Sequence, residues 1–350
     1  MTIKERKADH IRICRNERVA PGHCYWDDVR LVHNALPEID ADDIDMTCRL
    51  FRSELEFPLI VTAITGGFPG AKKINAHIAE ACAEMGIGMG IGSERAGVTG
   101  SSPESFSVIK DYDVPLVIGN IGAVQLIGQK SGKMFTDEMV QEAMDLVDAD
   151  VMAVHLNPLQ EMVQPEGDRN FAGCYDTIRG LARKYPIIVK ETGAGISPQV
   201  MSKLKGIGIQ GVDISGMGGT SFAAVEFYRA LETEDNIGSN LGNTFFDWGI
   251  PAPVSLKSCA GCGLPLIASG GILDGLHAAT SIAMGATAAG IANAILKDAM
   301  ESTQAVIDKL TIIKEELRAA MLLTGSKDLK QLSNARYVIL GETKEWMEQI

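Results

Sequence analysis

The sequence predicts an α/β protein in which eight parallel strands and the helices between them form a (β/α)8 TIM barrel. Three observations support this fold. Short runs rich in apolar and β-branched residues recur from Leu59 onward, as is typical of strands buried on both faces. Stretches with the residue spacing of amphipathic helices lie between most of these runs. The alternation continues through eight strands, which favours a closed barrel over a doubly wound sheet.

Residues 1–57 come before the barrel and are polar and irregular. We expect them to form a short helix and a strand-like extension that covers the barrel. Residues 58–296 are the expected barrel core, and residues 297–350 are expected to form a C-terminal helical tail. The whole chain, 1–350, is therefore predicted to be a single domain.

The barrel elements are predicted in chain order from their patterns. The expected strands are Leu59–Ile64, Ile87–Ile91, Leu116–Gly119, Val151–Val154, Ile187–Val189, Gly211–Ile214, Leu266–Ala268 and Ala286–Ile291. The expected helices between them include Ala71–Met85, Thr136–Val147, Gly173–Arg183, Pro198–Leu204, Ser221–Leu231 and Gly275–Met284.

Three segments depart from this alternation. Glu232–Thr244 is polar and rich in Gly and Asn, so we expect a mobile loop after the sixth strand that could act as a lid. Ala294 to about Leu323 has the pattern of one long amphipathic helix. Ser326–Ile350 is expected to pack outside the barrel or at a subunit contact.

Composition limits the classes of function. The net charge of −13 argues against broad binding to nucleic acid or anionic membranes, so an anionic substrate needs a local basic pocket. No apolar run is long enough to span a bilayer, and the polar start is unlike a secretory signal. Seven cysteines without a disulfide-like pattern suit a reducing cytoplasm. Cys259 and Cys262 form a C-x-x-C without a second ligand pair, and we interpret them as small residues ending a helix.

The fourth strand ends in a dense group of polar side chains. Val151–Val154 is followed by His155, Asn157, Gln160 and Glu161. A buried strand that stops in hydrogen-bonding groups is typical of the catalytic end of a barrel, although a strand followed by a polar turn is the simpler interpretation.

The loops after the last three strands predict a phosphate site. Ser215–Ser221, Ser269–Ile272 and Gly290–Asn293 all contain glycine, and glycine lets a phosphate approach backbone N–H groups. Barrels that bind phosphorylated ligands commonly hold the phosphate after strands seven and eight.

Other strand ends carry candidate binding groups. Lys190 could be a Schiff-base nucleophile, a phosphate ligand, a partner for an anionic ring, or simply a lysine paired with Glu191. Thr65, Ser93 and Asn120 could hydrogen-bond to the edge of a planar polar ring.

A basic group near the N-terminus is a second candidate. Arg6, Lys7 and His10, together with Arg95 and His155, could form the positive pocket that an anionic substrate needs. Glu161 would then suit Mg²⁺, which one or two carboxylates and substrate phosphates commonly hold. A solvated basic tail is the alternative.

Six segments of this sequence closely resemble type 2 isopentenyl-diphosphate delta-isomerase, an FMN-dependent barrel family. They are Arg6–His10, Thr65–Gly67, Gly92–Arg95, His155–Glu161, Val189–Gly193 and Gly218–Ser221. The likeness extends from Arg6 to the last strand. It implies an isomerase (EC 5.3.3.2) that interconverts isopentenyl and dimethylallyl diphosphate in isoprenoid biosynthesis.

The resemblance also implies roles for individual residues. It places FMN against Ala63, Ile64, Thr65, Ser93, Asn120, Lys190, Ser215, Thr220, Gly271, Ile272, Leu273, Ala292 and Asn293. It places the substrate among Arg6, Lys7, His10, Ser93, Arg95, His155, Asn157 and Gln160, with Gln160 at the reacting carbons and Glu161 on Mg²⁺. Glu94, Phe222, Leu273 and Asn293 depart from the usual pattern, and Leu273 puts one contact near the cofactor phosphate in doubt.

The isomerisation is a 1,3-allylic proton transfer without net redox change, and Gln160 is a poor acid or base. We therefore expect reduced FMN to serve as the acid and base, with NAD(P)H needed only to reduce the flavin. The alternatives are an FMN-dependent oxidoreductase of the hydroxy-acid oxidase type and a non-catalytic flavin-binding protein. The first needs a His-Arg pair in a late-strand loop, which this sequence lacks. We also expect a homo-oligomer, a tetramer or an octamer.

Overall fold

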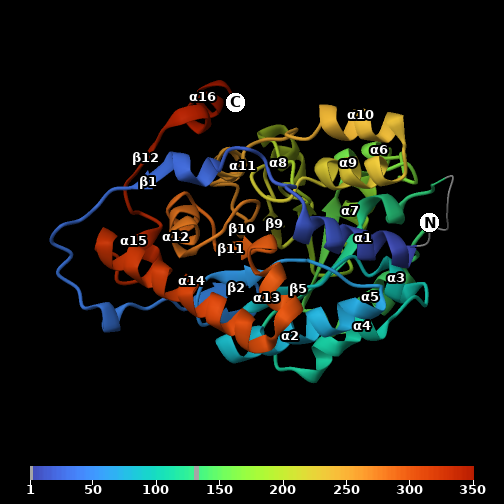
Figure 1. Ribbon diagram of the computed structural model, residues 1–350. Helices are drawn as coiled ribbons and strands as arrows, with labels where there is room; N and C mark the ends of the chain where they lie inside the picture. The colour runs from blue at the N-terminus through green and yellow to red at the C-terminus, as the bar shows by residue number, and fades with distance from the viewer. Residues whose placement is uncertain (1–2, 130–133) are drawn as a thin grey trace.

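The computed structural model describes residues 3–129 and 134–350. Its central sheet is a closed barrel in which neighbouring strands run parallel, in the order β10-β11-β4-β5-β6-β7-β8-β9. Helices surround the barrel (Figure 1). The predicted (β/α)8 barrel is therefore confirmed.

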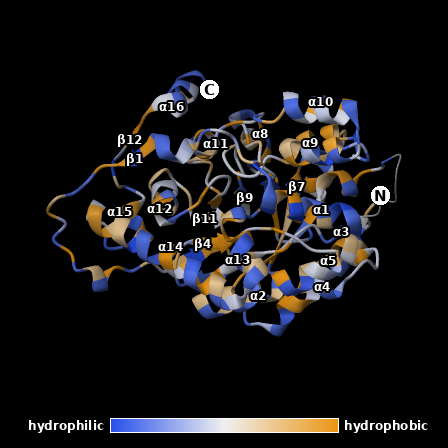
Figure 2. Ribbon diagram, in the orientation of Figure 1, coloured by the Kyte–Doolittle hydropathy of each residue, from blue (hydrophilic) through white to orange (hydrophobic). Residues whose placement is uncertain are grey.

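All eight expected strands form, with small differences in their ends. They are β4 (Leu59–Val61), β5 (Gly88–Gly90), β6 (Val117–Gly122), β7 (Val151–Leu156), β8 (Ile187–Glu191), β9 (Gly211–Asp213), β10 (Leu266–Ala268) and β11 (Ala288–Ile291). Their apolar residues are buried on both faces, and Figure 2 shows hydrophobic colour at β4, β7 and β11. Burial on both faces is the reason that these strands appear in the sequence as continuous apolar runs.

The helices around the barrel also follow the predicted order. They are α2 (Pro69–Met85), α3 (Arg95–Val98), α4 (Glu104–Ser107), α5 (Asp137–Val147), α6 (Pro158–Val163), α7 (Cys174–Leu181), α8 (Pro198–Leu204), α9 (Phe222–Glu232), α10 (Asn236–Thr244), α11 (Ala252–Cys259), α12 (Gly275–Ala283) and α13 (Leu296–Glu301). Several begin at residues whose side chains accept a backbone N–H of the first turn: Thr136, Ser197, Ser221 and Asp274. Cys259 is the last residue of α11, as the sequence predicted.

The N-terminal extension covers both ends of the barrel. Helix α1 (Ile3–Asn16) contacts α9 beside the carboxyl ends of the strands. The hairpin of β2 (Cys48–Leu50) and β3 (Ser53–Leu55) packs its apolar side chains against residues at the other end, among them Ile60 and Ile118. The 3-10 helix η1 (Tyr25–Asp28) and strand β1 (Val29–Leu31) lie between these parts of the chain.

The C-terminal tail differs from its prediction in one respect. The expected long helix is divided at Ser302, whose side chain accepts the N–H of Ala305 and starts α14 (Thr303–Thr324). The prediction of one helix was wrong because this capping serine lies within a continuous apolar pattern. The tail continues through α15 (Leu329–Leu332), β12 (Tyr337–Ile339) and α16 (Gly341–Gln349), and β12 pairs antiparallel with β1.

The segment predicted as a mobile loop after the sixth strand is helical. Asp235 accepts the N–H groups of Ile237 and Gly238 and starts α10, which packs on α9. A side chain at Gly242 would meet the backbone of Phe227 at 2.7 Å, so this glycine permits close helix packing. The loop prediction was wrong because the glycines and asparagines serve helix capping and packing here.

In the described ranges, none of the helices is both long and apolar enough to cross a membrane.

Candidate active site

A cavity of about 430 Å³ opens at the carboxyl ends of the barrel strands. Residues at the ends of all eight strands line it, and α1 and the segment 20–24 complete its wall. Its volume is in the usual range for a small-molecule site. The parallel arrangement explains why side chains from distant parts of the sequence meet there, since every strand ends at the same edge.

Every residue that the sequence analysis nominated lies on the wall of this cavity. The set is Arg6, Lys7, His10, Ala63, Ile64, Thr65, Ser93, Arg95, Asn120, His155, Asn157, Gln160, Glu161, Lys190, Ser215, Thr220, Gly271, Ile272, Leu273, Ala292 and Asn293. The position of each residue is thus established, whereas the role of each stays a prediction.

Two glycines bring the loops after β9 and β10 into close contact. Gly270 and Gly271 have φ values of 94° and 81°. A Cβ at Gly270 would lie 2.0 Å from the carbonyl oxygen of Gly216, and one at Gly271 would lie 2.7 Å from that of Gly218. The loops therefore present backbone rather than side chains to the cavity, as a phosphate-binding loop requires. Leu273 is 48% exposed and provides no charge, so it adds no positive charge to these loops.

Lys190 forms an ion pair with Asp213 on the neighbouring strand β9. The distance from Lys190 Nζ to Asp213 Oδ2 is 2.6 Å, and Asp213 Oδ1 also accepts hydrogen bonds from the side chain of Ser269 and from the Ser215 N–H. The alternative pairing with Glu191 is wrong, because that carboxylate accepts backbone N–H groups, including that of Gly193 at 2.6 Å. An ammonium held by Asp213 suits a partner for an anionic ring better than a Schiff-base nucleophile, which needs a free lone pair.

His155 is buried and hydrogen-bonded to Asn120. The distance from its Nδ1 to Asn120 Oδ1 is 2.8 Å, and Asn120 Nδ2 donates to the carbonyl of Ile91. Burial, together with the charges of Lys190 and Lys7, lowers the pKa of His155 to about 3. The ring is therefore neutral near pH 7, with Nδ1–H donating to Asn120.

The polar group after β7 is suited to a hard cation. Asn157 Nδ2 donates to Glu161 Oε1 at 3.0 Å and to Gln160 Oε1 at 3.2 Å, while the backbone N–H of Asp168 donates to Glu161 Oε2. Burial raises the pKa of Glu161. Asn157 Oδ1 is buried and has no hydrogen-bond partner among the described residues. These oxygens are the donor type that Mg²⁺ prefers, so the residues fit such an ion.

Three basic side chains give the cavity a positive wall in an acidic protein. Lys7 Nζ donates to the carbonyl of Ser93 at 2.7 Å, and burial, with Arg6 and Arg95 nearby, lowers its pKa to about 7. Arg6 Nε is buried without a partner in the described chain. Arg95 Nη1 lies 3.0 Å from Asp168 Oδ2. An uncompensated buried guanidinium N–H and a destabilised ammonium both favour the arrival of an anion.

His10 lines the cavity but also holds α1 in place. Its Nε2 lies 2.9 Å from Oε1 of the buried Glu226 on α9, and Glu226 is paired with Arg229. Arg229 in turn donates to Glu166 Oε1 at 2.9 Å. Any contact of His10 with a substrate must therefore use its other ring nitrogen.

Sequence reasoning missed part of the cavity wall. Gln164 directly follows α6, four residues after Gln160, and is buried, so its spacing could have identified it. Pro21–Cys24 and Thr192 also line the cavity. Pro21–Cys24 carries no signal in the sequence, because it reaches the cavity only through the path of the N-terminal extension.

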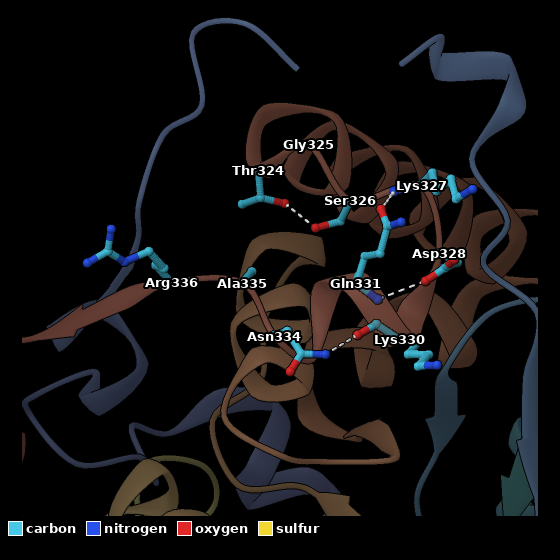
Figure 3. Close-up of a pocket in the computed structure, with 10 residues that line it drawn as sticks. All are labelled: Thr324, Gly325, Ser326, Lys327, Asp328, Lys330, Gln331, Asn334, Ala335 and Arg336. Carbon is cyan, nitrogen blue, oxygen red and sulfur yellow. Dashed lines mark hydrogen bonds between the residues drawn. The ribbon is translucent and has the colours of Figure 1, made fainter. Parts of the chain in front are cut away.

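A second hollow lies between α14 and β12 (Figure 3) and is open to solvent. The residues around it are Thr324, Gly325, Ser326, Lys327, Asp328, Lys330, Gln331, Asn334, Ala335 and Arg336. Their polar groups largely bond to one another, as between Gln331 N and Asp328 Oδ1. None of the predicted site residues lies there.

Comparison with known proteins identifies the family of this chain. Residues 160–339 match the family described as FMN-dependent dehydrogenase. The chain is 42% identical over 347 residues to the isopentenyl-diphosphate delta-isomerase of Picrophilus torridus, with 99% of each chain covered. It is 44% identical over 352 residues to the enzyme of that name from Methanothrix thermoacetophila, covering 100% of this chain and 97% of the relative.

Solved structures resemble the fold at low sequence identity. A flavocytochrome b2 variant with sulfite bound has a TM-score of 0.65 at 15% identity, covering 97% of this chain and 84% of the other. A mandelate oxidase variant has a TM-score of 0.63 at 16% identity, covering 95% and 100%. At these identities the likeness concerns the barrel alone.

Proposed function

The chain belongs to the FMN-dependent, type 2 isopentenyl-diphosphate delta-isomerases, and from this membership we propose how its cavity performs the reaction. The enzyme interconverts isopentenyl and dimethylallyl diphosphate with the help of FMN. The observation that carries the proposal is the single cavity in which a glycine-lined backbone cradle, a positive wall and the Asn157–Gln160–Glu161 group face one another.

We propose that the cofactor phosphate lies against the backbone of the Gly270–Gly271 loop and the Ala292–Asn293 turn. Thr65, Ser93 and Asn120 would hydrogen-bond to the ring system, and Lys190, oriented by Asp213, would place a positive charge beside it. When bound in its reduced form, FMN supplies a ring nitrogen that can give and accept a proton.

Arg6, Lys7, Arg95 and His155 surround the proposed diphosphate position. Asn120 fixes the His155 ring, and the arginines provide N–H groups suited to phosphate oxygens. Glu161 would hold Mg²⁺ against the diphosphate, and Asn157 supports that carboxylate with its side-chain N–H. Closure by α1 would keep water away from the reacting carbons.

Gln160 would lie beside the reacting carbons and orient the proton transfer. Its Oε1 accepts from Asn157, so its orientation is linked to the metal ligand next to it.

We further propose that NAD(P)H serves only to reduce the flavin, because the isomerisation has no net redox change. We also propose a cytoplasmic location, in keeping with seven free cysteines, and a homo-oligomeric assembly.

The test is an anaerobic assay of the purified flavoprotein. After reduction, it should convert isopentenyl diphosphate to dimethylallyl diphosphate in the presence of Mg²⁺. Parallel reactions should supply 2-hydroxy acids to the oxidised protein. Oxidation of a hydroxy acid without isomerisation would overturn the proposal in favour of the oxidase alternative.

The low pKa of Lys7 predicts a pH-dependent KM. As pH rises through about 7, the free enzyme loses the Lys7 ammonium charge, so KM for the diphosphate should rise by up to about tenfold per pH unit. Lys7→Arg keeps its charge, and its KM should depend less on pH. Ionisation of the substrate affects both enzymes equally, so it cancels in the ratio of the wild-type KM to the Lys7→Arg KM at each pH. Identical dependence of KM on pH in the two enzymes would refute this role of Lys7.

Gly271→Ala should weaken FMN binding by at least about tenfold, because the new Cβ would meet the carbonyl of Gly218 at the proposed phosphate cradle. The matched control is Gly100→Ala, since Gly100 also has a positive φ of 83° but has open space around it. Both variants carry the backbone strain, whereas only the first disturbs the cradle. Equal FMN affinities, measured by flavin fluorescence, would show that the loop does not hold the cofactor.

A further inference from the structure

Cys24, Asp27 and His277 meet at one edge of the cavity wall, outside the groups that the proposed function uses. One sulfur, one carboxylate oxygen and one imidazole nitrogen from these residues all lie within 4.8 Å of one another. The distance from His277 Nε2 to Asp27 Oδ1 is 3.0 Å. Two of the three come from the N-terminal extension and the third from α12, so the cluster joins segments about 250 positions apart in sequence.

The three donor atoms are a set that zinc prefers. Zn²⁺ binds thiolate, imidazole and carboxylate at about 2.0–2.3 Å, so neighbouring ligand atoms of a tetrahedral site lie about 3.3–3.8 Å apart. The three donor atoms of this cluster lie within 4.8 Å of one another, which is about 1 Å beyond that spacing at most, so binding an ion requires the side chains to draw together. Mg²⁺ and Ca²⁺ prefer all-oxygen sites, so they are poor candidates.

The local backbone also suits a thiolate ligand. Cys24 and Asp27 are separated by two residues, as the close ligand pairs of structural zinc sites are. Burial and the Asp27 carboxylate raise the pKa of Cys24, so a metal ion would have to displace the thiol proton. The N–H of Asp27 donates to the Cys24 carbonyl at 3.0 Å, and this tight turn holds the two ligand residues close together.

His277 has a carboxylate behind its ring. Its side chain is 7% exposed, and its Nδ1 lies 3.7 Å from Asp274 Oδ1. Nδ1 now accepts the N–H of Leu273 at 3.4 Å. Metal binding uses the Nε2 lone pair, so the ring proton would move to Nδ1, which would exchange the Leu273 contact for a hydrogen bond to Asp274. The thiol proton of Cys24 would be released to solvent. A carboxylate that orients a ligand histidine in this way is a common support of zinc sites.

We propose that Cys24, Asp27 and His277 form a Zn²⁺ site whose fourth position is taken by water. The site is accessible, because the Asp27 side chain is 62% exposed. Two negative ligands would balance the charge of the ion. Trp26, between two of the ligands, donates from Nε1 to the carbonyl of Gly270 at 2.9 Å, so the ion would also brace the glycine loop of the cavity.

The test is a titration of the chelator-treated full-length protein with Co²⁺ and then with Zn²⁺. Cobalt should bind at one equivalent and give the charge-transfer band of a thiolate ligand, and zinc should displace it. Cys24→Ser should abolish the band, and His277→Gln should weaken cobalt binding by on the order of 100-fold. Asp274→Asn, which keeps the helix cap, should weaken it by about tenfold.

The controls separate this site from others in the chain. Cys14→Ser removes another cysteine of the cavity wall, and Glu161→Gln removes the proposed magnesium ligand. Both should retain the cobalt band. Loss of the band in Cys14→Ser, retention in Cys24→Ser, or a dependence on His23 in place of His277 would each overturn the assignment. None of these readouts depends on isomerase activity, so the zinc site can fail while the proposed function holds.

Discussion

Replacing Gln160 with alanine should lower kcat at least about 100-fold while changing the dissociation constant of FMN by less than about threefold. Gln160 lies on the cavity wall after β7, and Asn157 Nδ2 donates to its side-chain oxygen. The glycine loops proposed to hold the cofactor lie on other strands. An interaction made mainly in the transition state affects kcat, and orientation of a proton transfer typically contributes about 10²–10⁴-fold.

The measurement pairs anaerobic isomerase kinetics with a flavin-binding titration on the same preparation. Gln141→Ala controls for handling of the variants, because Gln141 is an exposed glutamine on α5 whose side chain donates to Asp145. Gln160→Glu keeps the shape and the acceptor oxygen of the side chain but loses the amide N–H. It therefore tests whether the reaction needs that N–H. Normal turnover of Gln160→Ala would remove this residue from the reaction.

Replacing Glu161 with glutamine should lower kcat/KM by about 1000-fold and remove its dependence on Mg²⁺. The substitution keeps the size of the side chain and an oxygen for Asn157 but removes the charge that would hold the ion. The carboxylate is buried and lies near Arg6, and it is the charged group of the Asn157–Gln160–Glu161 set proposed to hold the metal. Loss of a metal that stabilises diphosphate charge by several kcal/mol corresponds to this factor, at about 1.4 kcal/mol for each tenfold.

The experiment is a Mg²⁺ titration of activity for the wild type and the variant. Glu54→Gln, on the exposed face of the hairpin at the opposite end of the barrel, is the matched charge control. It should follow the wild-type curve. A Glu161→Gln enzyme that still saturates with Mg²⁺ at normal activity would show that the ion is held elsewhere.

The strands were predictable from the sequence because a strand buried on both faces appears as a continuous apolar run. The segment Val151–Leu156, for example, is apolar until His155, where the strand reaches the cavity. The sequence-based predictions failed where tertiary packing, and not local pattern, determined the secondary structure. The Gly- and Asn-rich segment that forms α10 is helical because Asp235 caps it and Gly242 lets it approach α9.

The candidate site was predictable where its residues follow strands, since every such residue reaches the same edge of the barrel. The partner of Lys190 could not be predicted, because it depends on register: His155, Lys190 and Asp213 are aligned across β7, β8 and β9. The contribution of Pro21–Cys24 depends on the course of the N-terminal extension around the barrel. The proximity of Cys24 to His277 likewise could not be predicted from the sequence.

The most direct test of the account compares product formed with reductant consumed. Under anaerobic conditions with Mg²⁺, the oxidised flavoprotein receives isopentenyl diphosphate and a much smaller molar amount of NADPH or NADH. We predict many molecules of dimethylallyl diphosphate for each molecule of nicotinamide oxidised. One nicotinamide oxidised for each product molecule would contradict an isomerase that needs reduction only once.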